Sequence, residues 1–167
     1  MSSNLPGWLP ELIDTNGTWV EVVAVLYEVF KRDFINGNPS FDGLPIWWDR
    51  HHEGGDQYED GFWHLITRDD SNPANGRIPD LPRAQRLPWC RATIDNCSEP
   101  EVLVFDYAEG NGKRRTYIWL YQCDYVVILN QLYRRGAPSA FMLVTAFPLD
   151  GPSKRRAMQK KYDNREA

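Results

Sequence analysis

Two apolar runs within residues 125–147, which read YVVILNQLYRRGAPSAFMLVTAF, predict a pair of neighbouring strands. The runs cover 125–129 and 141–147, and both are rich in the β-branched and aromatic side chains that strands prefer. Gly136, Ala137 and Pro138 lie between them, and glycine and proline commonly form turns. We therefore expect the two runs to pair as a hairpin.

A second pair of apolar runs lies upstream, at 102–107 and 115–121. The segment between them contains Gly110-Asn111-Gly112-Lys113, a composition typical of a hairpin turn. Two successive hairpins predict four antiparallel strands. With helices expected before and after them, the sequence predicts an α+β domain built on a four-stranded antiparallel sheet.

Three segments have the pattern of helices. The first is an amphipathic helix over 18–34, where Thr18 can cap the first turn and apolar residues recur at helical spacing. The second is expected over 81–87, with a further turn or two over 89–94. The third is a basic helix over 153–163, which closes the chain.

Composition indicates one domain. The chain has 167 residues, of which 42% are apolar, an ordinary value for a globular protein. Residues 1–60 contain 3 Lys or Arg against 11 Asp or Glu, whereas residues 61–167 contain 16 against 12. We interpret 1–59 as an acidic extension of helix and loop, with a short strand or turn at 46–48, and 60–163 as the core. The more basic segment, 61–167, can bind a polyanion. An uneven distribution of charge over a solvated surface explains the same residue counts.

The spacing of the cysteines and the hydropathy of the chain indicate the cellular compartment. The three cysteines form no CxxC pair, which argues against a disulfide framework or a cysteine-based zinc site and fits a reducing cytosol. The run Asp49-Arg50-His51-His52-Glu53 lacks the spacing of a zinc motif, so we expect a loop there and neither a metal nor a cofactor. No apolar run is long enough to span a membrane, and a signal-peptide pattern is absent. We therefore expect a cytoplasmic location.

His64 is the first candidate for chemistry. It lies in the apolar run Phe62-Trp63-His64-Leu65-Ile66, which we expect to be a largely buried strand. Histidine has a pKa near neutrality and suits proton transfer. Arg68, four residues on, could hold an anion. A hydrogen-bonded core histidine followed by a solvated arginine is the simpler interpretation of the same residues.

Several arginines follow His64. Arg83 and Arg86 lie three residues apart on one face of the expected second helix, and Arg68 and Arg77 precede them. Guanidinium groups bind phosphate in a bidentate manner and can stabilise charge on a phosphoryl oxygen. The alternative is an exposed helix face on which these arginines pair with neighbouring aspartates.

Two further features point to anion chemistry. Thr145 places a hydroxyl in an otherwise apolar strand, where it either points across the sheet face or satisfies a neighbouring polar group. Lys154 and Arg155 lie at the start of the closing helix, where the main chain attracts anions. A P-loop, a GxGxxG motif and a GxSxG motif are all absent. A set of histidine, arginine, lysine and hydroxyl groups suffices to cleave RNA, because RNA supplies its own nucleophile in the 2′-hydroxyl group.

Four segments, FWHLITRD (62–69), RAQRLPWCRATIDNC (83–97), DYVVIL (124–129) and LVTAFPLD (143–150), followed by the basic helix, resemble a known family. In order and character they are similar to the metal-independent ribonucleases of toxins and phages known as the barnase–EndoU–colicin–RelE-like (BECR) group. The resemblance covers about 60–163 and implies N-terminal helices packed on a four-stranded antiparallel sheet with catalytic groups on one face.

The resemblance also implies a reaction, in which a 2′-hydroxyl attacks the adjacent phosphorus and leaves a 2′,3′-cyclic phosphate. The implied partners are RNA and an antitoxin or immunity protein, and the protein would be toxin-like, delivered into a cell or encoded by a phage. The acidic chain departs from the family, whose small toxins are usually basic, and the expected sheet offers no second histidine as an acid. The resemblance matches the family's histidine to His64, its arginine to Arg68 or to Arg83 and Arg86, its late-strand hydroxyl to Thr145, and its basic helix to Lys154 or Arg155. In the resulting hypothesis His64 is the base, Arg68, Arg83 and Arg86 stabilise the phosphate, Thr145 orients it, and Lys154 or Arg155 anchors the next phosphate. Arg77 is a further candidate for substrate binding.

Catalysis requires the side chains of His64, Arg86 and Thr145 to converge on one point. If they diverge, the alternative is a non-catalytic module that binds nucleic acid or protein. Seven tryptophans and the acidic extension 1–59 are also consistent with such a module. A transferase acting on a nucleotide cofactor is a third class, without a positive motif.

Overall fold

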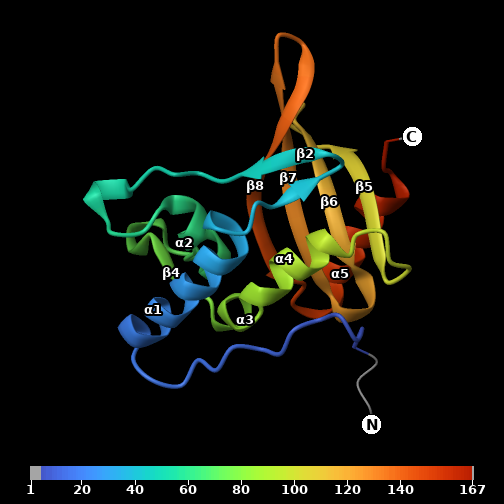
Figure 1. The fold of residues 1–167 in the computed structure, drawn as a ribbon. Helices are drawn as coiled ribbons and strands as arrows, with labels where there is room; N and C mark the ends of the chain where they lie inside the picture. The colour runs from blue at the N-terminus through green and yellow to red at the C-terminus, as the bar shows by residue number, and fades with distance from the viewer. Residues whose placement is uncertain (1–4, 167) are drawn as a thin grey trace.

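The structure is a computed structural model that describes residues 5–166, and it is α+β, as the sequence predicts. Its centre is a curled mixed sheet in the order β1-β2-β8-β7-β6-β5 (Figure 1). The strands are β1 (Ser40–Phe41), β2 (Leu44–Trp47), β5 (Val102–Ala108), β6 (Arg114–Leu120), β7 (Tyr125–Arg134) and β8 (Ala137–Pro148).

The prediction of four antiparallel strands is wrong for the sheet as a whole. β5 to β8 do form a continuous antiparallel block, with Phe105 opposite Tyr117 and Ile128 opposite Thr145. However, β2 adds to the free edge of β8 in parallel orientation, with Ile46 opposite Phe141, and β1 follows it. Ile46 is buried, so this edge is closed by a segment that comes from far upstream in the chain.

The helices between residues 19 and 95 lie on one side of the sheet. They are α1 (Trp19–Phe30), which continues as one π-helical turn at Lys31–Ile35, α2 (Asp60–Ile66), α3 (Leu81–Gln85) and α4 (Leu87–Asp95). The Thr18 hydroxyl accepts a hydrogen bond from the Glu21 main chain at 3.3 Å, which confirms the predicted cap. Leu26 and Phe30 of α1 and Ile94 of α4 lie in the main hydrophobic core.

The segment around His64 is a helix, so the expected strand over 62–66 is wrong. Phe62, Leu65 and Ile66 are buried at the spacing i, i+3, i+4, which gives α2 one apolar face. A short apolar run fits a strand and a buried helix equally well, and the tertiary contacts decide between them. At Gly61 the helix lies so close to the preceding chain that a Cβ atom would lie 2.9 Å from the Asp49 carbonyl oxygen.

The segment after α2 is also more ordered than the loop predicted over 69–79. It forms a two-stranded sheet of β3 (Thr67–Asp69) and β4 (Arg77–Pro79), in which Arg68 lies opposite Ile78. Short 3-10 turns occur in its connection and elsewhere in the loops, at Pro73–Asn75, Glu53–Gly55 and Tyr121–Cys123.

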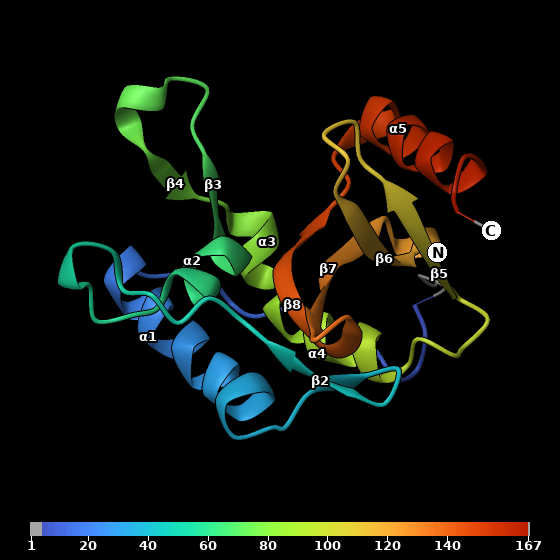
Figure 2. The same cartoon turned by 90° about the horizontal axis from the view of Figure 1, so that it is seen from above.

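The last helix, α5 (Gly151–Asp163), lies on the opposite face of the sheet from α1 and α4, as the turned view shows (Figure 2). Met158 of α5 packs there with Phe105, Trp119 and Val126 in a second, smaller hydrophobic cluster. α5 covers only part of this face, and the rest of the face is the floor of the site described next.

Candidate phosphate-binding groove

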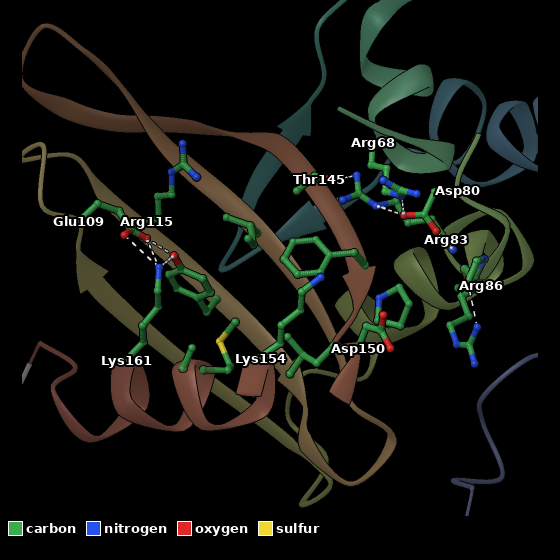
Figure 3. Close-up of a pocket in the computed structure, with 18 of the residues that line it drawn as sticks. Arg68, Asp80, Arg83, Arg86, Glu109, Arg115, Thr145, Asp150, Lys154 and Lys161 are labelled. Carbon is green, nitrogen blue, oxygen red and sulfur yellow. Dashed lines mark hydrogen bonds and ion pairs between the residues drawn. The ribbon is translucent and has the colours of Figure 1, made fainter. Parts of the chain in front are cut away.

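An open groove of about 1500 Å³ crosses the sheet face between α3 and α5 (Figure 3). Its floor includes Ile128 of β7 and Phe147 of β8. Three acidic side chains line it: Asp80, Glu109 and Asp150. Six basic side chains line it: Arg68, Arg83, Arg86, Arg115, Lys154 and Lys161. The surplus of positive charge makes this face attractive to polyanions.

Arg83 organises the α3 end of the groove. Asp80 caps α3 by accepting a hydrogen bond from the Arg83 main chain at 3.1 Å, and its carboxylate lies 3.4 Å from the Arg83 guanidinium. Arg83 Nη1 also donates to the carbonyl oxygens of His64 and Thr67, at 3.0 and 2.8 Å. Burial lowers the pKa of Arg83, but arginine remains protonated in proteins. Arg83 thus fixes the end of α2 against α3.

Thr145 lies at the same point. Its hydroxyl donates to the His64 carbonyl oxygen at 2.8 Å and accepts from Arg83 Nη1 at 3.3 Å. The structure therefore brings Thr145 and Arg83 together. It is the main chain of His64 that meets them, and not its imidazole. The convergence that catalysis was expected to require, of the His64, Arg86 and Thr145 side chains, is not found, because His64 does not line the groove.

His64 lines a separate pocket of about 440 Å³, together with Trp19, Trp63 and Arg77. Burial lowers the pKa of His64, and the neighbouring Arg77 lowers it further. Arg77 is held there by hydrogen bonds from its guanidinium to the hydroxyl and carbonyl oxygens of Thr67, at 2.8 and 2.7 Å. The expected convergence of His64 and Arg77 on the groove is therefore not found, because α2 turns the imidazole away from β8.

Arg155, expected as an alternative to Lys154, also lies outside the groove. Its guanidinium is 3.4 Å from Asp124 and donates to the Tyr121 carbonyl oxygen. Lys154 lines the groove, so the two neighbouring bases of α5 point to different surroundings. The helical step of about 100° per residue explains the difference.

Arg86 and Arg68 complete the α3 end (Figure 3). Arg86 donates to the Pro82 carbonyl oxygen at 3.1 Å, and its guanidinium lies over the ring of Trp89. The Arg68 side chain is 51% exposed and lies 3.8 Å from Asp80, a distance that leaves it available to an incoming anion.

The opposite end of the groove contains a polar cluster that the sequence hypothesis missed. Glu109 and Lys161 lie side by side there (Figure 3), and Tyr117 bonds to both of them. Lys161 Nζ donates to the two Glu109 carboxylate oxygens at 2.9 and 3.0 Å and to the Tyr117 hydroxyl at 3.0 Å. The Tyr117 hydroxyl in turn donates to Glu109. The three side chains come from the β5–β6 turn, from β6 and from α5.

The protonation states in this cluster follow from its contacts. Burial acts to raise the pKa of Glu109, but the hydrogen bonds from Tyr117 and Lys161 outweigh it and leave this pKa below its usual value. Burial acts to lower the pKa of Lys161, and the same bonds hold it above its usual value. Burial and the bond to Glu109 raise the pKa of Tyr117. At neutral pH the cluster therefore holds a carboxylate, an ammonium group and a neutral phenol.

The sequence contains a pattern that could have pointed to this end of the groove. Lys154, Met158 and Lys161 recur at i, i+4 and i+7, so they share the face of α5 that is turned to the sheet. Arg115 is two residues from Tyr117 on β6 and thus on the same face of the strand. The position of Glu109 beside Lys161 depends on how α5 packs, and the sequence offers no signal for it.

Comparisons of the chain with protein-family models, with curated proteins and with solved structures give no match. Among residues 5–166, no three histidine, cysteine, aspartate or glutamate side chains are grouped so that they could bind one metal ion. In the same residues, no helix combines the length and the apolar character needed to span a bilayer.

Proposed function

We propose that this chain is an endoribonuclease that binds RNA along the groove and cleaves it through its own 2′-hydroxyl group. The observation that carries the proposal is the row of six basic side chains along one open groove, from Arg86 at the α3 end to Lys161 at the α5 end. A row of cations along a groove matches the spacing of charges along a nucleic-acid strand better than it matches a single small anion.

The α3 end is suited to hold the reacting strand by its phosphates. Arg68 and Arg86 have the weakest internal contacts of the arginines there, so they are free to bind phosphoryl oxygens. Arg83 is committed to three main-chain and hydroxyl acceptors and acts mainly by its charge and by positioning Thr145. Lys154 lies between the two ends and binds the next phosphate.

For proton transfer we assign the carboxylate and the ammonium group at the opposite end, in place of His64. The lowered pKa of Glu109 and the raised pKa of Lys161 favour return of the proton to Lys161 and oppose its uptake by Glu109, so the bound RNA must weaken the ion pair before the reaction. The Glu109 carboxylate accepts the proton of the 2′-hydroxyl group as the bond from O2′ to phosphorus forms. The bond from phosphorus to O5′ breaks, and O5′ receives a proton from the Lys161 ammonium group. The products are a 2′,3′-cyclic phosphate and a free 5′-hydroxyl group, and Glu109 then returns a proton to Lys161 through their hydrogen bond.

The test is incubation of the pure protein with a labelled RNA in the presence of EDTA, with identification of the product ends. We expect 2′,3′-cyclic phosphate ends, and we expect no cleavage when the nucleotide before the cleaved bond carries 2′-deoxyribose. Glu109→Gln should lower the cleavage rate about 100-fold or more while RNA affinity is kept, because the amide cannot act as a base. Glu99→Gln, at an exposed acid outside the groove, is the matched control.

The outcomes separate the two function classes. RNA binding without cleavage by the wild-type protein would leave a nucleic-acid-binding module, the alternative favoured by the position of the His64 imidazole outside the groove. Absence of RNA binding even at low salt would exclude both the ribonuclease and the nucleic-acid-binding module. Equal cleavage by wild type and Glu109→Gln would exclude the proton-transfer role of this cluster.

A further inference from the structure

We propose that the tip of the β7–β8 hairpin, residues Tyr133, Arg134 and Arg135, is a second binding surface for unpaired RNA that leaves the groove. This inference rests on the proposed function. It extends the site from a groove that holds the cleaved bond to a surface that selects longer single-stranded substrates.

The hairpin extends beyond the rest of the sheet. β6 pairs with β7 only as far as Leu129, and β2 pairs with β8 only at Phe141 and Met142. Residues 132–140 therefore form a two-stranded ribbon with no neighbouring strand on either side, and its tip, residues 133–138, is exposed and stands clear of the molecule (Figure 1). A ribbon of this kind is accessible to a large ligand from several directions.

The chemistry of the tip is that of a nucleic-acid contact. Tyr133 is 56% exposed, and both arginines that follow it are exposed. The segment 131–140 contains no aspartate or glutamate, and among the described residues neither Arg134 nor Arg135 forms an ion pair. An exposed aromatic ring beside two unpaired guanidinium groups offers stacking to a base and charge to the phosphates next to it.

The tip is also held in a defined shape. Arg135 and Gly136 have φ angles of 54° and 79°, the left-handed conformations that close a tight two-residue hairpin turn. Residues 133 and 134 are still paired with β8, opposite Pro138 and Ala137. The three side chains are therefore presented by an ordered turn, which lowers the entropic cost of binding.

The groove and the tip are connected by the same strands. Ile128 in the groove floor and Arg134 near the tip lie six residues apart on β7, about 20 Å at the rise of an extended strand. A strand of RNA that reaches both must be longer than the segment that fills the groove. Tyr133 can stack only on a base that is free of a duplex, so the proposal commits to an unpaired strand.

The experiment compares two fluorescent single-stranded RNAs at low salt, one of about 5 and one of about 20 nucleotides, against two sets of variants. The hairpin variant carries Tyr133→Ser, Arg134→Ser and Arg135→Asn, since asparagine tolerates the positive φ at that position. The control carries Arg156→Ser and Lys160→Ser, two exposed bases of α5 that do not line the groove. A single Tyr133→Ser variant separates stacking from charge.

We expect the hairpin variant to lose about 10-fold or more in affinity for the long RNA, since stacking of one base alone contributes about that much, and to keep wild-type affinity for the short RNA. The control should change the affinity for the long RNA by much less. Loss of the same factor for both RNAs, or for neither, would overturn the proposal, as would equal loss on a duplex of the same length. If the wild-type protein binds neither RNA, the proposed function itself fails.

Discussion

At the scale of single residues, a buried carboxylate and a glycine determine where α2 lies. Glu59 is 7% exposed, and it accepts hydrogen bonds from the Tyr27 hydroxyl at 2.7 Å and from Trp48 Nε1 at 3.4 Å. Burial and the bond to Glu59 raise the pKa of Tyr27 to about 12. Beside it, Gly61 lets the first turn of α2 approach Asp49 closely, so the helix is anchored at its start by side-chain and steric contacts.

Replacement of Gly61 by alanine should destabilise the fold by about 2 kcal/mol. The added Cβ would lie 2.9 to 3.0 Å from the main chain of Asp49 and the Cβ of Trp48, and neither is the end of a flexible side chain. The measurement is chemical denaturation. Gly110→Ala is the control, because nothing lies within 4 Å of its Cβ position. Equal stability of the two variants would contradict the close approach at α2.

The surroundings of His64 and His51 predict their pKa values and the effect of pH on stability. The pKa of His64 should lie below 6.5 because of burial and Arg77, and that of His51 above 6.5 because of its hydrogen bond to Asp60. Since folding lowers the pKa of His64, its contribution to stability is present above pH 6.5 and is lost as the pH falls through its folded value. An NMR titration of the ring protons measures both values. Arg77→Met should raise the pKa of His64, and an unchanged value would refute the stated cause.

At the scale of elements, α5 is held to the sheet by an apolar cluster around Met158, by the polar cluster at Lys161 and by the contacts of Arg155 with Asp124 and Tyr121. Met158 packs under the helix, while Lys161 reaches the β5–β6 turn at Glu109 and lies over the rings of Tyr107 and Tyr117. The same polar contacts that are proposed to transfer protons thus also fix the helix in position. The two roles can be separated, because the structural role affects the opening of α5 and the chemical role affects the cleavage rate.

Lys161→Met should lower the free energy of unfolding by about 2 kcal/mol, because Glu109 loses its charged donor and keeps its partly buried position. Hydrogen exchange should become faster in α5 and in the β5–β6 turn. Lys160→Met removes a neighbouring exposed charge and serves as the control. Exchange that is as slow in Lys161→Met as in the control would mean that the polar cluster does not hold the helix.

At the scale of the whole molecule, charge is divided between the N-terminal part and the groove. The 11 acidic residues of 1–60 contribute none of the groove lining, and all six groove bases come from residues 68–161. The net charge of −4 therefore hides a cationic binding face. An acidic chain can still bind a polyanion when its positive charges share one surface.

The basic side chains of the groove predict that the affinity for RNA falls steeply as the salt concentration rises. Arg83 and Lys161 are bound within the protein, so the phosphate contacts come from Arg68, Arg86, Arg115 and Lys154. Four contacts give a slope of about −3 for the logarithm of RNA affinity against the logarithm of salt concentration, at about 0.7 per contact for a single strand. Replacement of Arg86 and Lys154 by alanine should reduce the slope to about −1.4. Titrations at several salt concentrations measure it. A slope near zero in the wild-type protein would show that phosphates do not bind along the groove.

Local patterns were sufficient for most of the elements and for part of the site. The cap at Thr18, the helix that follows it and the block of strands from β5 to β8 agree with the sequence prediction. Arg83 and Thr145 meet at the main chain of His64, whereas the expected convergence of the His64, Arg86 and Thr145 side chains is not found. The prediction for 62–66 was wrong because a run of four apolar residues around one histidine does not distinguish a strand from a helix.

The sequence by itself determined the elements whose contacts are local: the capped helix and the two hairpins, although the turn expected at Gly136-Ala137-Pro138 lies at Arg135 and Gly136. Only the tertiary structure decided that β2 closes the edge of β8, that the imidazole of His64 opens away from the groove, and that Glu109 lies against Lys161. The physical reason is the range of the interactions. Caps, turns and periodic burial act over a few neighbouring residues, whereas these three contacts join segments that are tens of residues apart and form only when the whole chain packs.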